Sequence, residues 1–270
     1  MADVQRVAFI TGASSGIGRA CAERLAASGW TVAGASRRGT GGSGWAGLVA
    51  NVDDDAAVQS AVETVAASSG RIDALIACAG YTLAGAAECT LVAEAKAQFE
   101  TNFWGCVRAV QAVLPHMRRQ QGGRIVLISS IGGAVGLPFQ AFYSASKFAL
   151  EGFAEALAYE VAPFGVHVTL VEPGNIATNA TANRVRSSGD VGSAAYAAAL
   201  AKAVTTMERD EVSGPPAEIV AAAVQRVLDS ARPPLRVSVG RPGERVALVA
   251  KRLLPFRVFR AAAKSGLGVD

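Results

Sequence analysis

The stretch VAFITGASSGIG, residues 7–18, decides the fold expected for this 270-residue chain. Its first half is continuously apolar and has the length of a buried strand, and its second half places three glycines before a helix-forming run. Such glycines let the backbone approach a pyrophosphate closely, and the helix N-terminus adds free N–H groups and partial positive charge. A tight turn without a ligand is the weaker alternative. We predict a dinucleotide site at Gly12, Ser14, Ser15, Gly16, Ile17 and Gly18.

Other apolar runs of strand length alternate with helix-length segments along the chain. They are continuous, as expected of parallel strands that are covered on both faces. The expected strands are Val4–Ile10, Thr31–Ala35, Gly47–Ala50, Ala74–Ala77, Arg124–Ser129, Val166–Val171 and Leu235–Val239. Helices are expected from Ile17 to a C-cap at Gly29, over Asp53–Ser68 and over Phe148–Ala162. The pattern predicts the α/β class: one Rossmann-type, doubly wound parallel sheet of about seven strands in the order 3-2-1-4-5-6-7, with helices on both faces.

The domain organisation expected is one dinucleotide-binding and catalytic domain over residues 1–270. Residues 179–214 form a substrate lid, because Thr181–Ser213 is polar and alanine-rich and lacks a clean strand. Residues 241–270 form a C-terminal helical extension, in which Glu244–Lys264 is a basic amphipathic helix broken at Pro255. Such a helix fits a membrane surface, but it also fits packing on its own domain or on a subunit partner, and we favour packing.

Composition excludes several classes of protein. Half of the chain is hydrophobic, 51%, and the net charge is only +4, without the basic tract that binds nucleic acid. The four cysteines form no C-x-x-C pair, and the two histidines lie far from each other in the sequence. No metal site is therefore expected. The cysteines are Cys21, Cys78, Cys89 and Cys106, and the histidines are His116 and His167. Without a secretory leader or a spanning apolar run, we expect a cytoplasmic protein with reduced thiols.

The segment Tyr143-Ser-Ala-Ser-Lys147, in which the tyrosine and the lysine are four positions apart, carries the candidate chemistry. On a helix, residues i and i+4 share a face, and a lysine ammonium beside a phenol favours the phenolate form. An isolated pair of this kind would be a coincidence. Here Ser130 stands thirteen residues upstream, at the end of an apolar strand, where ligands bind in this architecture.

Several motifs in order make the chain resemble a classical short-chain dehydrogenase/reductase from Val4 to about Thr178 and in its final strand. They are TGASSGIG at Thr11–Gly18, Ala77-Cys78-Ala79-Gly80 in place of N-N-A-G, Asn102 in ETNFWG, Ser130 in ISS, YSASK, and the P-G-x-x-x-T turn at Pro173–Thr178. The segment SIGGAVGLPFQAFYSASKFALEGFAEAL further resembles the 17β-hydroxysteroid and retinol dehydrogenase branch.

The resemblance implies roles for four residues. Tyr143 is implied to be the general acid in reduction and the general base in oxidation, and Lys147 to assist it and to bind the nicotinamide ribose. Ser130 is implied to donate to the substrate oxygen, and its neighbour Ser129 to face the cofactor. Asn102 is implied to hold a water that links Lys147 to solvent, although an asparagine that caps a local helix kink is the alternative.

The end of the second expected strand predicts NADP(H) rather than NAD(H). Ser36 stands where NAD-binding proteins have an acid, and Arg37 and Arg38 follow, as suits a 2′-phosphate unless both arginines are only solvated. Asn51 and Val52 are expected near the adenine, and Cys78 puts cofactor affinity in doubt because it replaces an amide. The remaining cofactor-binding residues are expected to be Ala79, Gly80, Tyr143, Lys147, Pro173, Gly174, Ile176 and Thr178.

These expectations combine into an NADP(H)-dependent oxidoreductase that interconverts a carbonyl and a primary or secondary alcohol on a lipophilic steroid-, retinoid- or acyl-like substrate. The pocket is expected between Ile131–Leu137, Pro173–Asn175 and the lid, with an apolar lining from Ala134, Val135, Leu137, Phe139 and Phe142. The alternative is a non-catalytic NADP-binding sensor or scaffold. A homodimer or homotetramer is expected, with Phe148, Phe153 and Leu157 at its interface unless these residues pack inward.

Overall fold

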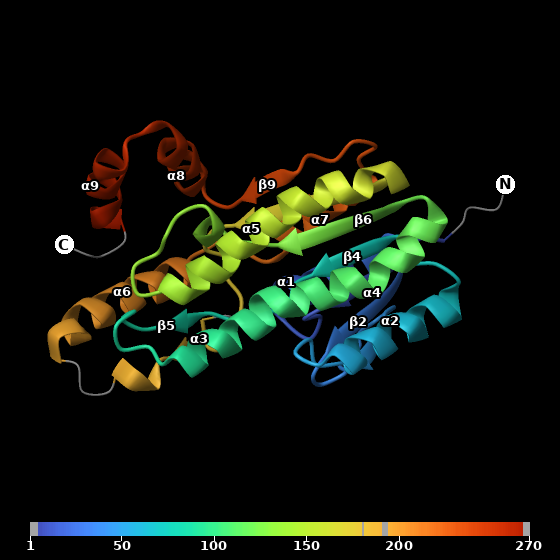
Figure 1. Ribbon diagram of the computed structural model, residues 1–270, viewed down its shortest axis with the longest axis horizontal. Helices are drawn as coiled ribbons and strands as arrows, with labels where there is room; N and C mark the ends of the chain where they lie inside the picture. Colours follow the sequence, from blue (N-terminus) through green and yellow to red (C-terminus); the bar gives the residue numbers. More distant parts are fainter. Residues whose placement is uncertain (1–4, 180, 191–193, 267–270) are drawn as a thin grey trace.

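A seven-stranded parallel sheet runs through the computed structural model, which describes residues 5–179, 181–190 and 194–266 (Figure 1). The strand order is β3-β2-β1-β4-β6-β7-β9. The strands are β1 Val7–Thr11, β2 Thr31–Ser36, β3 Ala46–Val49, β4 Ala74–Ala77, β6 Gly123–Ile128, β7 Val166–Pro173 and β9 Arg236–Val239. The predicted fold class and strand order are therefore confirmed.

Two short strands depart from the prediction. The strands β5 (Leu83–Ala84) and β8 (Val185–Arg186) pair in parallel as a separate small sheet, so the expectation of no strand within Thr181–Ser213 is wrong. Two residues carry too little periodicity to be seen in a sequence, and only the partner segment stabilises them. The first strand begins at Val7 rather than Val4, and Val4 lies outside the described residues.

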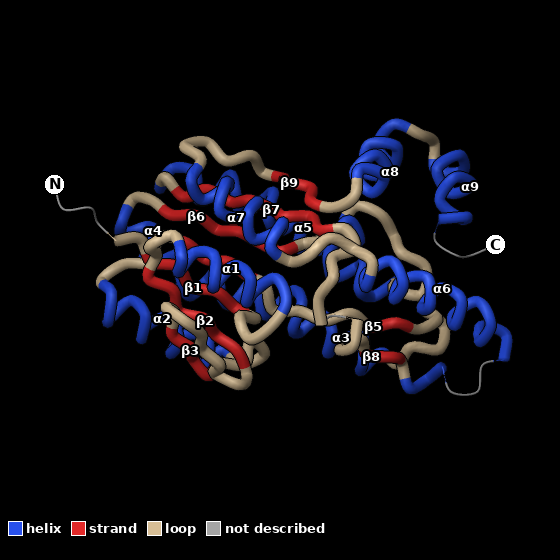
Figure 2. Tube along the Cα trace, turned by 180° about the vertical axis from the view of Figure 1, so that it is seen from behind, coloured by secondary structure: helices blue, strands red, loops and turns tan. Residues whose placement is uncertain are grey.

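Helices cover both faces of the sheet (Figures 1 and 2). On one face, α2, α4 and α5 contribute to one hydrophobic cluster, and on the other α1 and α7 contribute to a second. The helices are α1 Gly16–Ala27, α2 Asp55–Ser69, α3 Val92–Phe99, α4 Gly105–Gln120, α5 Ala141–Val161, α6 Ala194–Val212, α7 Glu218–Asp229, α8 Pro242–Leu253 and α9 Phe256–Gly266. The C-cap of α1 is Ser28 rather than the predicted Gly29, which follows it with φ of 82°, and the predicted break at Pro255 separates α8 from α9.

The helix α5 begins seven residues before the predicted start at Phe148. The serines that hide this turn from a hydrophobicity pattern are buried and bonded. Ser144 Oγ accepts a hydrogen bond from Leu137 N at 3.1 Å, and Ser146 Oγ donates to the Tyr143 carbonyl at 2.7 Å. Tyr143 therefore lies in the first turn of a helix that is anchored to the preceding loop.

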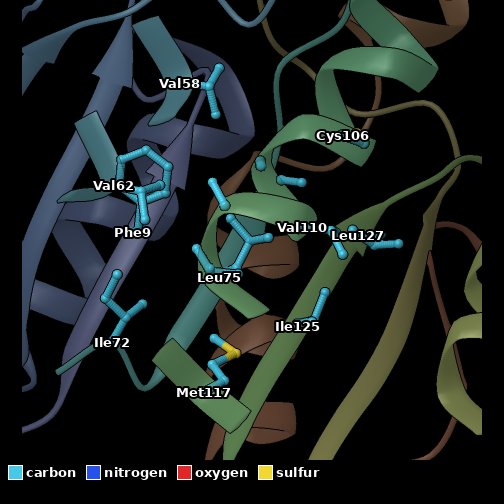
Figure 3. Close-up of a cluster of buried hydrophobic side chains, with 14 of the residues drawn as sticks. Phe9, Val58, Val62, Ile72, Leu75, Cys106, Val110, Met117, Ile125 and Leu127 are labelled. Atoms are coloured by element: carbon cyan, nitrogen blue, oxygen red, sulfur yellow. The ribbon is translucent and has the colours of Figure 1, made fainter. Parts of the chain in front are cut away.

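The core between the sheet and the α2–α4 layer fixes the strand ends (Figure 3). Phe9, Leu75 and Leu127 come from three neighbouring strands and are fully buried against Val110 and Met117 of α4. Burial of each such side chain stabilises the fold by about 1.5–3 kcal/mol. Because the strands are parallel, this packing brings all of their carboxyl ends to one edge.

The helix α6 belongs to the segment predicted as a lid, which is called the lid from here on. It lies with the C-terminal helices α8 and α9 at this same end of the molecule, where the arrowheads of β4 and β6 point (Figure 1). The view from behind shows the same arrangement (Figure 2). The described part of the 179–214 segment is thus placed to cover the carboxyl edge of the sheet.

The residues predicted for a subunit interface do not share one environment. Phe148 is 45% exposed, whereas Leu157 is buried, and the Phe153 ring packs edge-on against Phe103 with centroids 6.0 Å apart. The inward alternative holds for Leu157 and Phe153, because a sequence pattern does not say which helix face meets the sheet.

Candidate active site

One cavity of about 900 Å³ lies along the carboxyl ends of β1, β2, β4, β6 and β7. Every residue that the sequence predicted to bind cofactor lines it, and so does Ser130. Asn102 is the one predicted site residue that does not line the cavity. The cavity continues beneath the lid, so the glycine-rich turn and the Tyr143–Lys147 pair share one space.

The glycine-rich turn leaves room that a side chain would fill. Gly12 and Gly16 have φ of 68° and 54°, a region that favours glycine. A Cβ atom at Gly12 would lie 2.8 Å from the Ala79 nitrogen. Within the described part of the chain, the N-cap residue Ser15 makes no side-chain hydrogen bond that caps α1. The first turn of α1 contains no acidic residue. The helix N-terminus is therefore available to an anionic group.

Thr11, which was predicted only as part of the motif, ties the glycine turn to the loop after β4. Its Oγ1 accepts hydrogen bonds from Cys78 N at 3.2 Å and Ala79 N at 3.3 Å. The thiol of Cys78 contacts Cys21, and this contact together with burial raises the pKa of Cys78 well above its usual range. The raised pKa favours the thiol form of Cys78, and Thr11 holds the loop although position 78 carries no amide.

The end of β2 presents an unsatisfied polar atom to the cavity. Ser36 is buried, and its Oγ has no hydrogen-bond partner within the described part of the chain. Arg37 and Arg38 are exposed beside it, and Arg38 Nη2 lies 3.5 Å from the Ser14 carbonyl. Asn51, which also lines the cavity, accepts a hydrogen bond on its Oδ1 from Asp53 N at 3.3 Å. An orphaned hydroxyl, two cations and a glycine cradle fit a nicotinamide dinucleotide.

Tyr143, Ser130 and Lys147 converge beside this cradle. A Cβ atom at Gly132 would lie 3.1 Å from Tyr143 Cε1 and 3.4 Å from Ser130 Oγ, so the phenol ring and the serine flank one point. Ser130 Oγ accepts from Gly132 N at 3.0 Å, which leaves its own proton free to be donated. Lys147 is buried, and its Nζ donates to the Ile128 carbonyl at 2.8 Å.

Asn102 lies behind the site rather than in it. It belongs to a π-helical turn, Glu100–Trp104, of the kind often found at functional sites. Its Oδ1 accepts from Tyr81 N at 2.9 Å, and its Nδ2 donates to the Tyr81 carbonyl at 3.0 Å and to Ser146 Oγ at 3.3 Å. A Cβ atom at Gly80 would lie 3.1 Å from Asn102 Oδ1 and 3.9 Å from Lys147 Nζ. The asparagine amide thus clamps the β4–β5 loop next to the lysine.

Ser129 borders the cavity, but its hydroxyl is directed elsewhere. It donates to Glu151 Oε1 at 2.5 Å, and Arg236 Nε donates to Glu151 Oε2 at 2.9 Å. Burial raises the pKa of Glu151, against the opposing effect of the Ser129 and Arg236 hydrogen bonds. Neither Glu151 nor Arg236 was predicted, because residues so far apart in sequence meet only in the folded sheet.

The substrate end of the cavity is more polar than predicted. Of the five residues expected as an apolar lining, Leu137 alone borders it, and the prediction is wrong for Ala134, Val135, Phe139 and Phe142. The lid contributes amides, a hydroxyl and carboxylates together with apolar groups. These residues are Asn179, Asn183, Val185, Ala203, Thr206, Met207, Asp210 and Glu211. Hydrophobicity in the sequence did not reveal direction: Val135 packs away from the cavity, against Leu248 and Phe259.

A buried ion pair stabilises the lid. Arg184 Nη2 donates to Glu211 Oε1 at 2.5 Å, and Thr181 Oγ1 donates to Glu211 Oε2 at 2.6 Å. The Arg184 side chain is only 2% exposed. Loss of one partner would leave a buried charge unpaired, which costs far more than loss of a surface pair.

Within residues 5–179, 181–190 and 194–266, no group of three or more His, Cys, Asp or Glu side chains is placed to hold a metal ion. No described helix combines the length and apolar character needed to cross a bilayer.

Comparisons with known proteins agree on one family. Residues 6–189 match the pattern of the short chain dehydrogenase family. A 3-ketodihydrosphingosine reductase from Bacteroides thetaiotaomicron is 39% identical over 260 residues, which cover 96% of this chain and 97% of that protein. Bovine retinol dehydrogenase 8 is 38% identical over 66% of this chain and 61% of its own. A crystal structure of a short-chain dehydrogenase from Streptomyces avermitilis superimposes with a TM-score of 0.83, 34% identity and 98% coverage of both chains.

Proposed function

Because this chain belongs to the short-chain dehydrogenase family and is an oxidoreductase, we propose that it uses NADPH to reduce a ketone on a long-chain lipophilic substrate with a polar head. The observation that carries the proposal is the convergence of Tyr143 and Ser130 around Gly132, in a cavity continuous with the glycine cradle. A ketone that enters this cavity could meet the Tyr143 phenol and the Ser130 hydroxyl together, because both residues line it.

The residues of the chain perform the proton chemistry. NADPH held by the glycine-rich turn, Arg37 and Arg38 would supply the hydride for the carbonyl carbon. Ser130 donates a hydrogen bond to the carbonyl oxygen, where negative charge develops during reduction. The Tyr143 hydroxyl transfers its proton to that oxygen, and the Lys147 ammonium stabilises the phenolate that remains. In the oxidative direction Tyr143 accepts the alcohol proton.

The choice of NADPH over NADH rests on the mouth of the cavity. An acid at the end of β2 would repel a 2′-phosphate, and here Ser36 offers a hydroxyl that lacks a partner among the described residues. Arg37 and Arg38 supply the charge that a phosphate requires. A cytoplasmic NADPH pool would then favour reduction.

The substrate class is drawn from the lid and from the relative that is similar over nearly the whole chain. That relative is named for 3-ketodihydrosphingosine, a long-chain ketone with an amino alcohol head. Asp210 and Asn183 in this cavity fit amino and hydroxyl groups, and Leu137 and Met207 fit an alkyl chain. Steroid, retinoid and 3-oxoacyl ketones are the competing members of the lipophilic class.

The test is NADPH oxidation measured with 3-ketodihydrosphingosine, a steroid ketone, all-trans-retinal and a 3-oxoacyl thioester. We expect kcat/KM for the long-chain amino ketone to exceed the values for the other ketones by at least about tenfold. A tenfold difference corresponds to the free energy of one good polar contact. Tyr143→Phe should lower kcat by about 100- to 10,000-fold while NADPH affinity changes little. Failure of every ketone, or full activity of Tyr143→Phe, contradicts the proposal.

The non-catalytic sensor predicts a broken set of catalytic groups, and this chain retains Tyr143, Lys147, Ser130 and Asn102. It would gain support only if Tyr143→Phe kept all biological activity.

We also propose a homodimer or homotetramer that associates through α4 and α5. Trp104 is 49% exposed directly before α4, and Phe148 is 45% exposed on α5. Sedimentation velocity should show an assembly larger than one chain, which Phe148→Asp weakens.

A further inference from the structure

The helices α8 and α9, called here the C-terminal helical pair, expose the densest group of large apolar side chains in the described part of the chain. Val246 is 65% exposed, Leu253 76% and Phe256 62%, and Val249, Leu254 and Val258 are exposed as well. All six fall within thirteen residues. Isolated exposed apolar residues need no explanation, but a continuous group of this kind marks a binding surface.

The pair is attached to the domain by few apolar contacts. Leu248 and Phe259 are the two buried members of the pair, and they pack with Val135 and with the partly buried Ile131 and Ala134. Figures 1 and 2 show both helices standing outside the two helical layers of the sheet. The prediction that this segment packs on its own domain therefore describes only one side of each helix.

The charge of the pair selects its partner. The two helices contain six lysines and arginines and one carboxylate, Glu244. Among the described side chains no carboxylate lies within ion-pair distance of Arg245, Lys251, Arg252, Arg257 or Arg260. Lys251 instead lies over Phe256 and Phe259, 4.7 and 5.4 Å from their ring centroids. A second copy would bring like charges together, whereas an anionic bilayer complements both the cations and the apolar side chains.

The pair is also connected to the rim of the substrate cavity. Glu244 Oε1 accepts from Asn175 N at 3.0 Å and from Asn175 Nδ2 at 2.9 Å, and Asn175 lines the cavity. Ile131 lines the cavity too, and it is one of the residues that pack with Leu248 and Phe259. A surface bound by the pair would therefore lie next to the cavity.

We propose that the C-terminal helical pair is an interfacial anchor that binds the surface of an anionic lipid bilayer and holds the rim of the substrate cavity against it. The helices have 12 and 11 residues and lie on the membrane rather than across it. Delivery of a lipophilic substrate from the bilayer rests on the proposed function. Binding to the bilayer does not.

The experiment is co-sedimentation of the full chain with vesicles of phosphatidylcholine alone and of phosphatidylcholine with about 30% phosphatidylglycerol. The chain should pellet with the anionic vesicles at low salt, and high salt should release it. Leu253→Asp/Phe256→Asp should reduce the bound fraction at least about tenfold, and Arg252→Ala/Arg257→Ala about tenfold. The matched control is Val49→Asp/Val92→Asp, which adds the same two negative charges at valines outside the pair that are 76% and 68% exposed.

Three outcomes overturn the proposal. They are no pelleting with anionic vesicles, equal pelleting of Leu253→Asp/Phe256→Asp, and a changed oligomeric state of that variant with unchanged vesicle binding, which would assign the face to a second copy. Hydrogen exchange of the unmodified chain is independent of variant folding, and vesicles should protect residues 245–260. Turnover of a water-soluble ketone without vesicles should be unchanged in the variants. If the unmodified chain did not turn over this ketone, the result would count against the proposed function and not against binding of the C-terminal helical pair to a bilayer.

Discussion

At the residue scale, the proposed preference for NADP(H) depends on Ser36 and Arg37. Ser36→Asp/Arg37→Ala should move the preference from NADPH toward NADH by at least about tenfold, because a carboxylate repels a 2′-phosphate and accepts from a 2′-hydroxyl. The ratio of kcat/KM for the two cofactors measures this. Arg232→Ala removes an exposed arginine at the other end of the sheet and should leave the ratio unchanged. If the ratio of kcat/KM with NADPH to kcat/KM with NADH were unchanged in the double variant, the proposed NADP(H) preference would be wrong.

Glu151 is the residue whose titration should show in stability. Because burial raises its pKa in the folded chain, the proton is bound more tightly when folded than when unfolded. Its contribution to stability is present below the unfolded pKa and is lost as pH rises through the folded one. Glu151→Gln removes this dependence. The Tm of Glu151→Gln minus that of the unmodified chain should therefore increase from pH 5 to pH 8, and a flat or falling difference contradicts the assignment.

At the element scale, Glu94 of α3 holds the turn that follows β8. Its carboxylate accepts from Ser187 Oγ at 2.7 Å, from Ser188 N at 2.9 Å and from Ser188 Oγ at 2.8 Å. These bonds lower the pKa of Glu94 to about 2, led by the Ser188 backbone bond. The ionised carboxylate therefore stabilises the lid at pH values above the ordinary carboxyl pKa. This stabilisation is lost as the pH falls toward about 2 and the carboxylate takes up a proton.

Glu94→Gln should therefore loosen the lid at neutral pH. We expect trypsin to cut after Arg186 several-fold faster, since local opening exposes the chain to the protease, and KM for the ketone to rise. Glu160→Gln, a change of an exposed carboxylate on α5, is the control and should leave cleavage unchanged. Equal cleavage of the two variants would show that Glu94 does not hold the lid.

At the scale of the whole molecule, the continuous sheet predicts one cooperative unfolding unit, which is how the single-domain expectation can be tested. Leu127 is fully buried in β6, in the middle of the sheet. Leu127→Ala should lower the free energy of unfolding by about 2–5 kcal/mol. Far-UV circular dichroism and tryptophan fluorescence should shift together in denaturant. Two separate transitions would indicate two domains.

NADPH should raise the stability of this whole unit. A ligand that binds only the folded state at 100 times its Kd adds about 2.7 kcal/mol. Gly12→Ala should abolish most of the gain, because a Cβ at φ of 68° would meet the Ala79 backbone. Thermal shift with and without NADPH measures this, and an undiminished shift in Gly12→Ala would place the dinucleotide elsewhere.

The sequence by itself determined the buried strands, the glycine-rich turn and the motifs that contain Tyr143, Lys147 and Ser130. These features are encoded locally, by continuous apolar runs, glycines and residue spacing, whereas the strand order followed from the alternation of strands and helices and from the resemblance to a known family. The fourth predicted catalytic residue, Asn102, was located in sequence, but its bonds to Tyr81 and Ser146 were not.

Only the tertiary structure decided the contacts between distant segments. No local pattern encodes the contacts that join residues from separate elements. These contacts are the Ser129–Glu151–Arg236 network, the hydrogen bond between Glu94 and Ser188, and the Arg184–Glu211 ion pair. Direction was equally hidden: Val135 and Leu137 are both apolar, yet one packs against α8 and α9 and the other borders the cavity. Hydrophobicity is a property of a residue, whereas the side to which it points is set by everything packed around it.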